Sequence, residues 1–115
     1  MEEHYKLDRV RELAGGDQEF IETLAMTFLE EVPEDARILK IAVDSRDYLA
    51  SYKAAHKMKP TIDLFELGVL ETLIEVQDWG KFEQKEKDQE IPGKLDIVLA
   101  AIDRATEEIK EDFSL

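Results

Sequence analysis

The stretch that decides the fold lies near the C-terminus and reads PGKLDIVLAAIDRATEEIK from Pro92 to Lys110. Its apolar residues recur at alternating steps of three and four, the spacing that places side chains along one face of an α-helix. The members of this seam are Leu95, Val98, Ile102, Ala105 and Ile109. The pattern predicts a long amphipathic helix that packs against other helices.

The same periodicity extends through the first half of the chain. An opening helix is expected over residues 5–14, before a pair of glycines. Asp17 is a typical N-cap residue, and the apolar stripe that follows it continues to about Ser45. Pro33 lies inside this stripe, where it either kinks one helix or occupies the first turn of a second one.

A further helix is expected to begin near Asp47. Pro60 removes one backbone hydrogen bond from this helix, so we expect a bend or an early end there. Gly68 then punctuates the chain before the next helical pattern, and Trp79 is expected to cap one end of the packed helices. The inward face of the helix after Asp47 carries Tyr48, Tyr52, Ala55, Met58 and Ile62.

These patterns predict the fold class and the domain organisation. No stretch of alternating apolar and polar residues is long enough to compete as a strand. Four main helices joined by short connections predict an all-α, antiparallel four-helix bundle with a short extra helix at its N-terminal end. A length of 115 residues fits one domain over residues 1–115.

The composition excludes several classes of function. The formal net charge is −13, which argues against binding to nucleic acid or to an anionic membrane surface because the overall field repels both. The absence of cysteine excludes disulfides, thiolate metal sites and cysteine nucleophiles. No apolar run is long enough for a transmembrane helix or a signal peptide, so we expect a cytoplasmic protein.

The charge reverses in one window of the chain. Between Tyr48 and Ile62 there is no acidic residue, while His56 stands among three lysines. If the apolar face of this helix points inward, His56 falls roughly 120° from its centre and is at least partly exposed. The other residues expected to point outward on this side are Leu49, Lys53, Lys57, Pro60 and Leu64.

The chemistry of this window follows from its residue types. An unperturbed imidazole is mostly neutral at cellular pH and is then nucleophilic. Lys59 lies one turn along from His56, nearer the core boundary, and its ammonium could stabilise the charge of a phosphoryl group on the ring. Asp63 is a candidate ion-pair partner for Lys59. The alternative is an ordinary solvated helix face with an incidental histidine.

Residues 54–60, Ala-Ala-His-Lys-Met-Lys-Pro, resemble the A-H-x-L-K-G signature of the histidine phosphotransfer (HPt) domains of bacterial two-component phosphorelays. Residues 16–20 and 28–31, together with Asp47, resemble the layout of that family, and the resemblance covers roughly residues 8–109.

The resemblance implies a function as a phosphorelay carrier without kinase activity of its own. His56 would accept a phosphoryl group from the aspartate of one receiver domain and pass it to another, Lys59 would stabilise it, and Met58 would occupy the family's apolar core position. The surrounding residues Leu49, Lys53, Lys57, Pro60 and Leu64 would bind receiver domains of response regulators or hybrid histidine kinases. No cofactor or metal of its own is implied, and we expect a monomer.

The sequence departs from the family pattern at two places. Pro60 stands where the family has a glycine after the lysine, and Glu66 stands where a second glycine is common, with Gly68 two residues further on. The helical register beyond Asp63 is therefore open. The chain begins with Met1, which favours a free-standing carrier over a piece of a hybrid kinase.

Three other functions were weighed against phosphotransfer. An enzyme finds no support, because the chain has no G-x-S-x-G motif or glycine-rich phosphate loop and is too short to add an ATP-binding module. A carboxylate metal bundle needs Glu-x-x-His pairs, but Lys53 precedes His56 by three places and His4 lies near the terminus. An acidic helical adaptor would bind a basic protein partner through its overall charge, without phosphotransfer.

Overall fold

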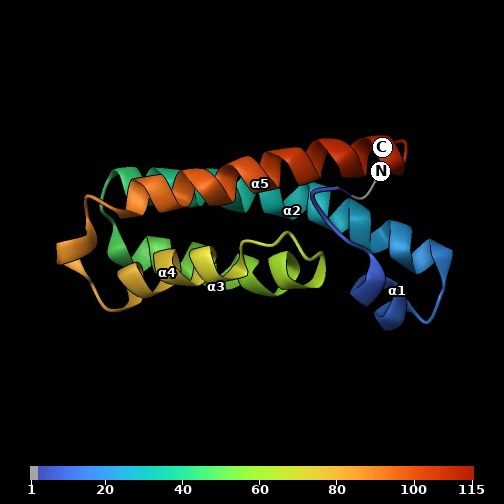
Figure 1. Cartoon of the computed structure of the whole chain (residues 1–115), viewed down its shortest axis with the longest axis horizontal. Helices are drawn as coiled ribbons and strands as arrows, with labels where there is room; N and C mark the ends of the chain where they lie inside the picture. The colour runs from blue at the N-terminus through green and yellow to red at the C-terminus, as the bar shows by residue number, and fades with distance from the viewer. Residues whose placement is uncertain (1–2) are drawn as a thin grey trace.

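The computed structural model describes residues 3–115, and these form helices joined by short connections (Figure 1). No strand occurs within that range, so the prediction of an all-α protein is confirmed. The helices are α1 (Asp8–Ala14), α2 (Gln18–Asp44), α3 (Tyr48–Leu64), α4 (Leu70–Lys81) and α5 (Ile91–Asp112), with a short 3-10 helix η1 (Lys85–Lys87) before α5.

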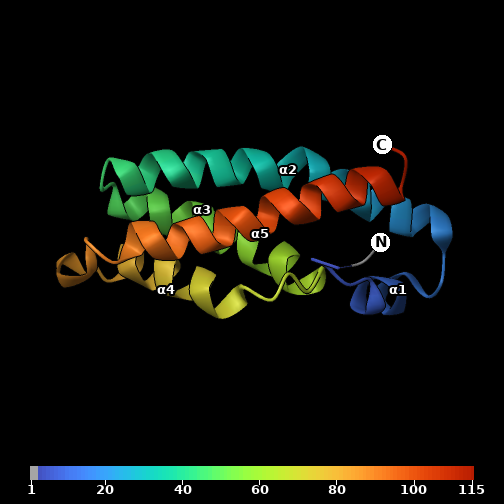
Figure 2. The same cartoon turned by 45° about the horizontal axis from the view of Figure 1, so that its top comes forward.

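The four longer helices surround one apolar core that is elongated along their common direction. Helix α3 packs between α2 and α4, and α5 contacts both α2 and α4 on the other side, as Figure 2 shows. Helix α1 packs on α2 at the end of the molecule opposite η1 (Figure 1). The molecule measures 45 × 22 × 20 Å. None of the helices described is both long and apolar enough to cross a membrane.

The apolar seam of α5 is buried along its whole length, as its spacing predicts. Its five residues, Leu95, Val98, Ile102, Ala105 and Ile109, are each at most 1% exposed. On α3 the predicted inward face is buried at Ala55, Met58 and Ile62, whereas Tyr48 and Tyr52 are only partly buried. Burial of these apolar side chains drives the packing of the helices.

The predicted N-caps are both present. The carboxylate of Asp17 accepts hydrogen bonds from the backbone N–H groups of Glu19 and Phe20, and that of Asp47 accepts one from Ala50. Each cap satisfies donors that the first turn of a helix leaves without an intrahelical partner. These contacts set where α2 and α3 begin.

Pro33 and Pro60 lie inside helices and end neither of them. Helix α2 continues through Pro33, so this proline does not begin a new helix, and α3 continues through Pro60 to Leu64. The predicted early end at Pro60 is therefore wrong. Ile62 and Phe65, beyond Pro60, are each 1% exposed, and their burial offsets the hydrogen bond that the proline removes.

Residues 3–7 form a strap that is not part of a helix. The opening helix expected over residues 5–14 begins only at Asp8, because Tyr5 and Leu7 are drawn into the core. The Tyr5 hydroxyl donates to Asp112 at 2.6 Å, and the backbone N–H of Lys6 donates to the carbonyl of Phe65 at 2.8 Å. The strap therefore joins the C-terminal ends of α3 and α5.

Candidate functional site

Helix α3 presents His56 to solvent from the middle of its stretch without acidic residues. The imidazole is exposed, as the helical geometry predicts, while Ala55 and Met58 on either side of it are buried and anchor this part of the helix to the core. Within the described part of the chain, neither ring nitrogen of His56 has a hydrogen-bond partner. Both nitrogens are therefore available to a reactant or a partner.

One aromatic ring lies against the imidazole. Tyr52, one helical turn before His56, stacks on it with ring centroids 5.6 Å apart and an angle of 29° between the ring planes. Sequence analysis assigned Tyr52 only to the core. Its partial burial shows that the ring lies at the boundary, where it reaches both the core and His56.

The three lysines around His56 have different environments. The ammonium of Lys57 lies 3.0 Å from the carboxylate of Asp35 on α2, and this hydrogen bond and charge raise the pKa of Lys57. Lys53 and Lys59 have no ion-pair partner among residues 3–115. Lys57 thus stays protonated and its charge is balanced by Asp35, while Lys59, one turn beyond His56, has no such partner in the described residues.

The candidate partner for Lys59 is used elsewhere. Asp63 forms an ion pair with Arg9 of α1, with 2.7 Å between Nη1 and Oδ1. The tertiary fold brings α1 to the end of α3, which the sequence did not reveal. Asp63 thus pairs with Arg9 and not with Lys59, and Lys59 forms no ion pair in the described structure.

The residues predicted to bind a partner are exposed, with one exception. Leu49 is 60% exposed, and Lys53, Lys57 and Pro60 are also on the surface. Leu64 differs from the prediction, because it is partly buried and packs against the core. Since α3 stays helical beyond Pro60 and is held by buried residues there, its last turn cannot rotate Leu64 fully outward.

Asp35 is a residue of this surface that sequence analysis missed. It is 6% exposed and lies in the apolar stripe of α2, three residues after Val32 and four before Leu39. A carboxylate at such a position signals a cross-helix partner, because an unpaired buried charge is strongly unfavourable. Together with Ile38, Ala50, Lys53, Ala54 and Lys57 it lines a shallow groove of about 300 Å³ between α2 and α3.

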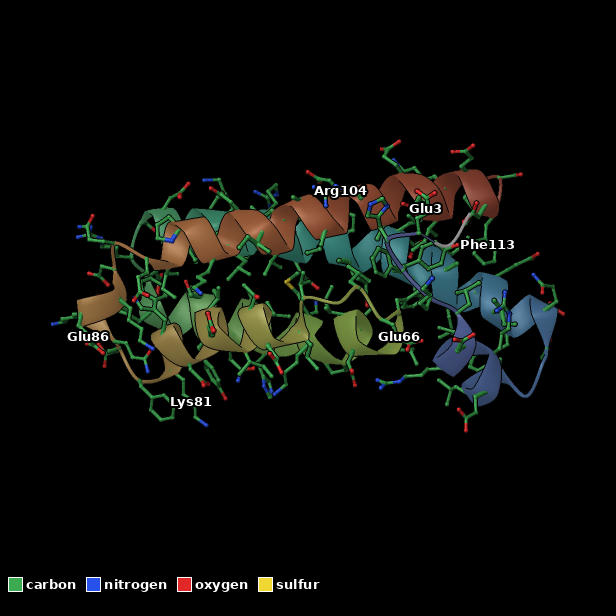
Figure 3. All side chains as sticks on the ribbon, in the orientation of Figure 1. Glu3, Glu66, Lys81, Glu86, Arg104 and Phe113 are labelled. Atoms are coloured by element: carbon green, nitrogen blue, oxygen red, sulfur yellow. The ribbon has the colours of Figure 1, made fainter. Side chains whose placement is uncertain are left out.

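A second group of titratable side chains lies at the strap, away from His56. Ligand atoms of Glu3, His4 and Glu108 lie within 4.8 Å of one another, and Figure 3 shows Glu3 beside α5. The Glu108 carboxylate also accepts hydrogen bonds from the backbone N–H groups of Glu3 and His4 and pairs with Nδ1 of His4. Partial burial raises the pKa of Glu108, but these interactions outweigh it and lower the pKa below its usual range.

This group has the donor types of a weak cation site, yet its oxygens already hold the strap. This group could not be predicted from the sequence, because 104 residues separate His4 from Glu108. Among the described residues, His56 is exposed without a hydrogen-bond partner, and Lys59, one turn further along α3, forms no ion pair. No protein-family model, curated protein or solved structure matches the chain in comparisons with known proteins.

Proposed function

We propose that this protein is a phosphorelay carrier of the HPt type, in which His56 accepts a phosphoryl group from a receiver-domain aspartate and passes it to another receiver. The observation that carries the proposal is an exposed imidazole without hydrogen-bond partners, one turn from an unpaired lysine, in a chain of net charge −13. The packing of α2, α3, α4 and α5 around one core suits an antiparallel four-helix bundle of that family.

The transfer step exchanges one bond at phosphorus. The lone pair of one His56 ring nitrogen attacks the phosphorus of the aspartyl phosphate, and the P–O bond breaks with its electron pair remaining on the aspartate carboxylate. The other ring nitrogen keeps its proton. Transfer to a second receiver reverses these bond changes, with a carboxylate as the attacking group.

Lys59 stabilises the phosphorylated state in this proposal. A phosphoryl group on the ring carries negative charge, and an ammonium one turn away on the same helix lies within reach of it. Lys59 suits this role better than Lys57, because the charge of Lys57 is already compensated by Asp35. The Mg²⁺ that assists such transfers would belong to the acidic pocket of the receiver.

The test is phosphotransfer from a purified, phosphorylated receiver domain to three forms of the full chain. The wild type and His4→Gln should acquire label that is lost in acid and retained in base, whereas His56→Gln should acquire none. His4→Gln is the matched control because it removes the other histidine of the chain. Circular dichroism should give equal helical content for all three.

Label retained in His56→Gln would place the acceptor elsewhere. The chain is instead an acidic adaptor if the wild type takes up no label but binds basic protein partners, and if His56→Gln binds those partners with the same affinity. In that case the positive surface around His56 would be dispensable.

A further inference from the structure

We propose that Tyr52 is a positioning residue for His56. Its ring restrains the imidazole by stacking on one face, so that the in-plane nitrogens stay directed away from α3 and open to a phosphodonor. This inference rests on the proposed phosphotransfer function. Tyr52 would orient the His56 imidazole before any partner binds.

The geometry of the two rings supports a restraint. Tyr52 and His56 lie four residues apart on α3, the separation at which side chains of a helix meet. Their centroids are 5.6 Å apart and their planes are inclined by only 29°, the geometry of an offset stack in which part of the Tyr52 ring lies against the imidazole. A side chain on a helix has few staggered rotamers. Contact with the Tyr52 ring favours the His56 rotamer in which the two rings meet.

Tyr52 can act as a support because its own turn of α3 is fixed. Gly80 of α4 lies so close to this turn that a Cβ built on it would meet the carbonyl oxygen of Tyr48 at 2.5 Å and the nitrogen of Tyr52 at 2.8 Å. Helix α4 therefore abuts α3 directly beneath Tyr52. The ring of Tyr52 is partly buried and lines one wall of a hollow next to this contact.

Stacking suits a nucleophilic imidazole better than a hydrogen bond would. The lone pair that attacks phosphorus lies in the ring plane, whereas Tyr52 contacts the π face. The contact therefore limits rotation without engaging either nitrogen, and neither nitrogen has another partner in residues 3–115. A restrained and correctly oriented nucleophile reacts faster than one that samples several orientations.

The first measurement reads the contact itself and does not depend on phosphotransfer. The ring-proton chemical shifts of His56 would be recorded by NMR in the wild type, Tyr52→Phe, Tyr52→Leu and Phe82→Leu. Phe82 is 62% exposed and has no ring contact with His56, which makes its substitution the matched control for loss of an aromatic ring. The ring-current shift should persist in the wild type, Tyr52→Phe and Phe82→Leu and disappear in Tyr52→Leu.

The second measurement tests whether the contact with Tyr52 affects the rate at which His56 is phosphorylated. Phosphoramidate would be used as the phosphodonor, since attack by the imidazole nitrogen on its phosphorus breaks the P–N bond and releases ammonia without any protein partner. The rate of labelling should fall about threefold in Tyr52→Leu, the loss expected when one favoured rotamer becomes one of about three. Tyr52→Phe should restore the wild-type rate, because the ring and not the hydroxyl makes the contact.

Three results would overturn the inference. His56 shifts that are the same in Tyr52→Leu and the wild type would show that the rings do not stack in solution. Equal labelling rates of a folded Tyr52→Leu and the wild type would show that stacking has no effect on reactivity. A wild-type protein that takes up no label from either phosphoramidate or a receiver would overturn the proposed function, and with it the role of Tyr52.

Discussion

At its first turn α3 directs Tyr48 into a cluster of satisfied polar groups, whereas about two turns later it directs His56 into solvent. In the first region the carboxylate of Asp88 accepts hydrogen bonds from the Tyr48 hydroxyl and the Trp79 indole, each at 2.9 Å. Burial and this carboxylate raise the pKa of Tyr48. The rings of Tyr48 and Trp79 also contact each other, with centroids 4.8 Å apart.

The two regions differ in whether their polar groups already have partners. At Asp88 the donors and the acceptor satisfy one another in a partly buried position, and the cluster joins the end of η1 to α3 and α4. At His56 the ring is held by a face contact only, and Lys59 has no acidic partner among the described residues. Unused bonding capacity in an exposed position is the property that a group-transfer site needs.

The largest effect on stability is expected from Asp88→Ala. This substitution leaves the Tyr48 hydroxyl and the Trp79 N–H without their acceptor, and each such loss costs roughly 1–3 kcal/mol. Urea denaturation should show a loss of about 3 kcal/mol in the free energy of unfolding, against about 1 kcal/mol for the control Tyr48→Phe. Labelling of His56 in folded protein should be unchanged, and a large loss of labelling would mean that the two regions are coupled.

A somewhat smaller loss is expected from Gly80→Ala, which lies between the two regions. The added methyl would collide with backbone atoms of Tyr48 and Tyr52, so α4 must shift relative to α3. We expect a loss of about 2 kcal/mol in the free energy of unfolding, as for other overpacked positions. The matched control is Gly93→Ala, where a Cβ meets nothing within 4 Å. Equal stabilities of the two variants would contradict the close approach of α3 and α4.

A loss of about 1 kcal/mol is expected from Glu108→Gln at neutral pH. The lowered pKa of Glu108 means that its carboxylate stabilises the folded state above its usual titration range, and that this contribution disappears as the pH falls through the lower folded-state pKa. The difference in urea midpoint between the wild type and Glu108→Gln should therefore shrink between about pH 7 and about pH 3. A difference that stays constant would show that the strap is not held by the ionised carboxylate.

A still smaller effect on stability is expected from Lys59→Ala. Lys59 has no ion pair to lose among the residues described, so the free energy of unfolding should change by no more than about 0.5 kcal/mol. The half-life of phosphorylated His56 should nevertheless shorten, because the ammonium proposed to stabilise the phosphoryl group is gone. Lys53→Ala serves as the control for removal of an unpaired positive charge. Unfolding of Lys59→Ala would show that the lysine is structural.

Receiver binding is expected to depend more on the first turn of α3, at Leu49, than on its last turn, at Leu64. Leu49 is exposed while Leu64 packs on the core, so Leu49→Glu should weaken receiver binding without destabilising the protein. Leu64→Glu should lower stability, and binding measured by calorimetry on folded protein should change less than for Leu49→Glu. The reverse order would mean that the receiver contacts the far end of α3.

Much of the fold could be predicted because it depends on local patterns. The seam from Leu95 to Ile109 and the caps at Asp17 and Asp47 are short-range features, and all of them are present. Of the two outcomes expected at Pro60, a bend or an early end, the early end does not occur, because burial of residues beyond the proline outweighs the local rule for helix ends. The strap before Asp8 was missed for the same reason, since the burial of Tyr5 and Leu7 depends on distant helices.

The sequence by itself determined the helical character of the chain, the acid-free window and the exposure of His56, because the helical period and residue type decide these properties. Only the tertiary structure decided how the neighbours of His56 are used. It paired Lys57 with Asp35 and Asp63 with Arg9, which leaves Lys59 free, and it set Tyr52 against the imidazole on a turn fixed by Gly80. The ion pairs and the close contact at Gly80 join different helices, and the distances between helices depend on how the whole core packs.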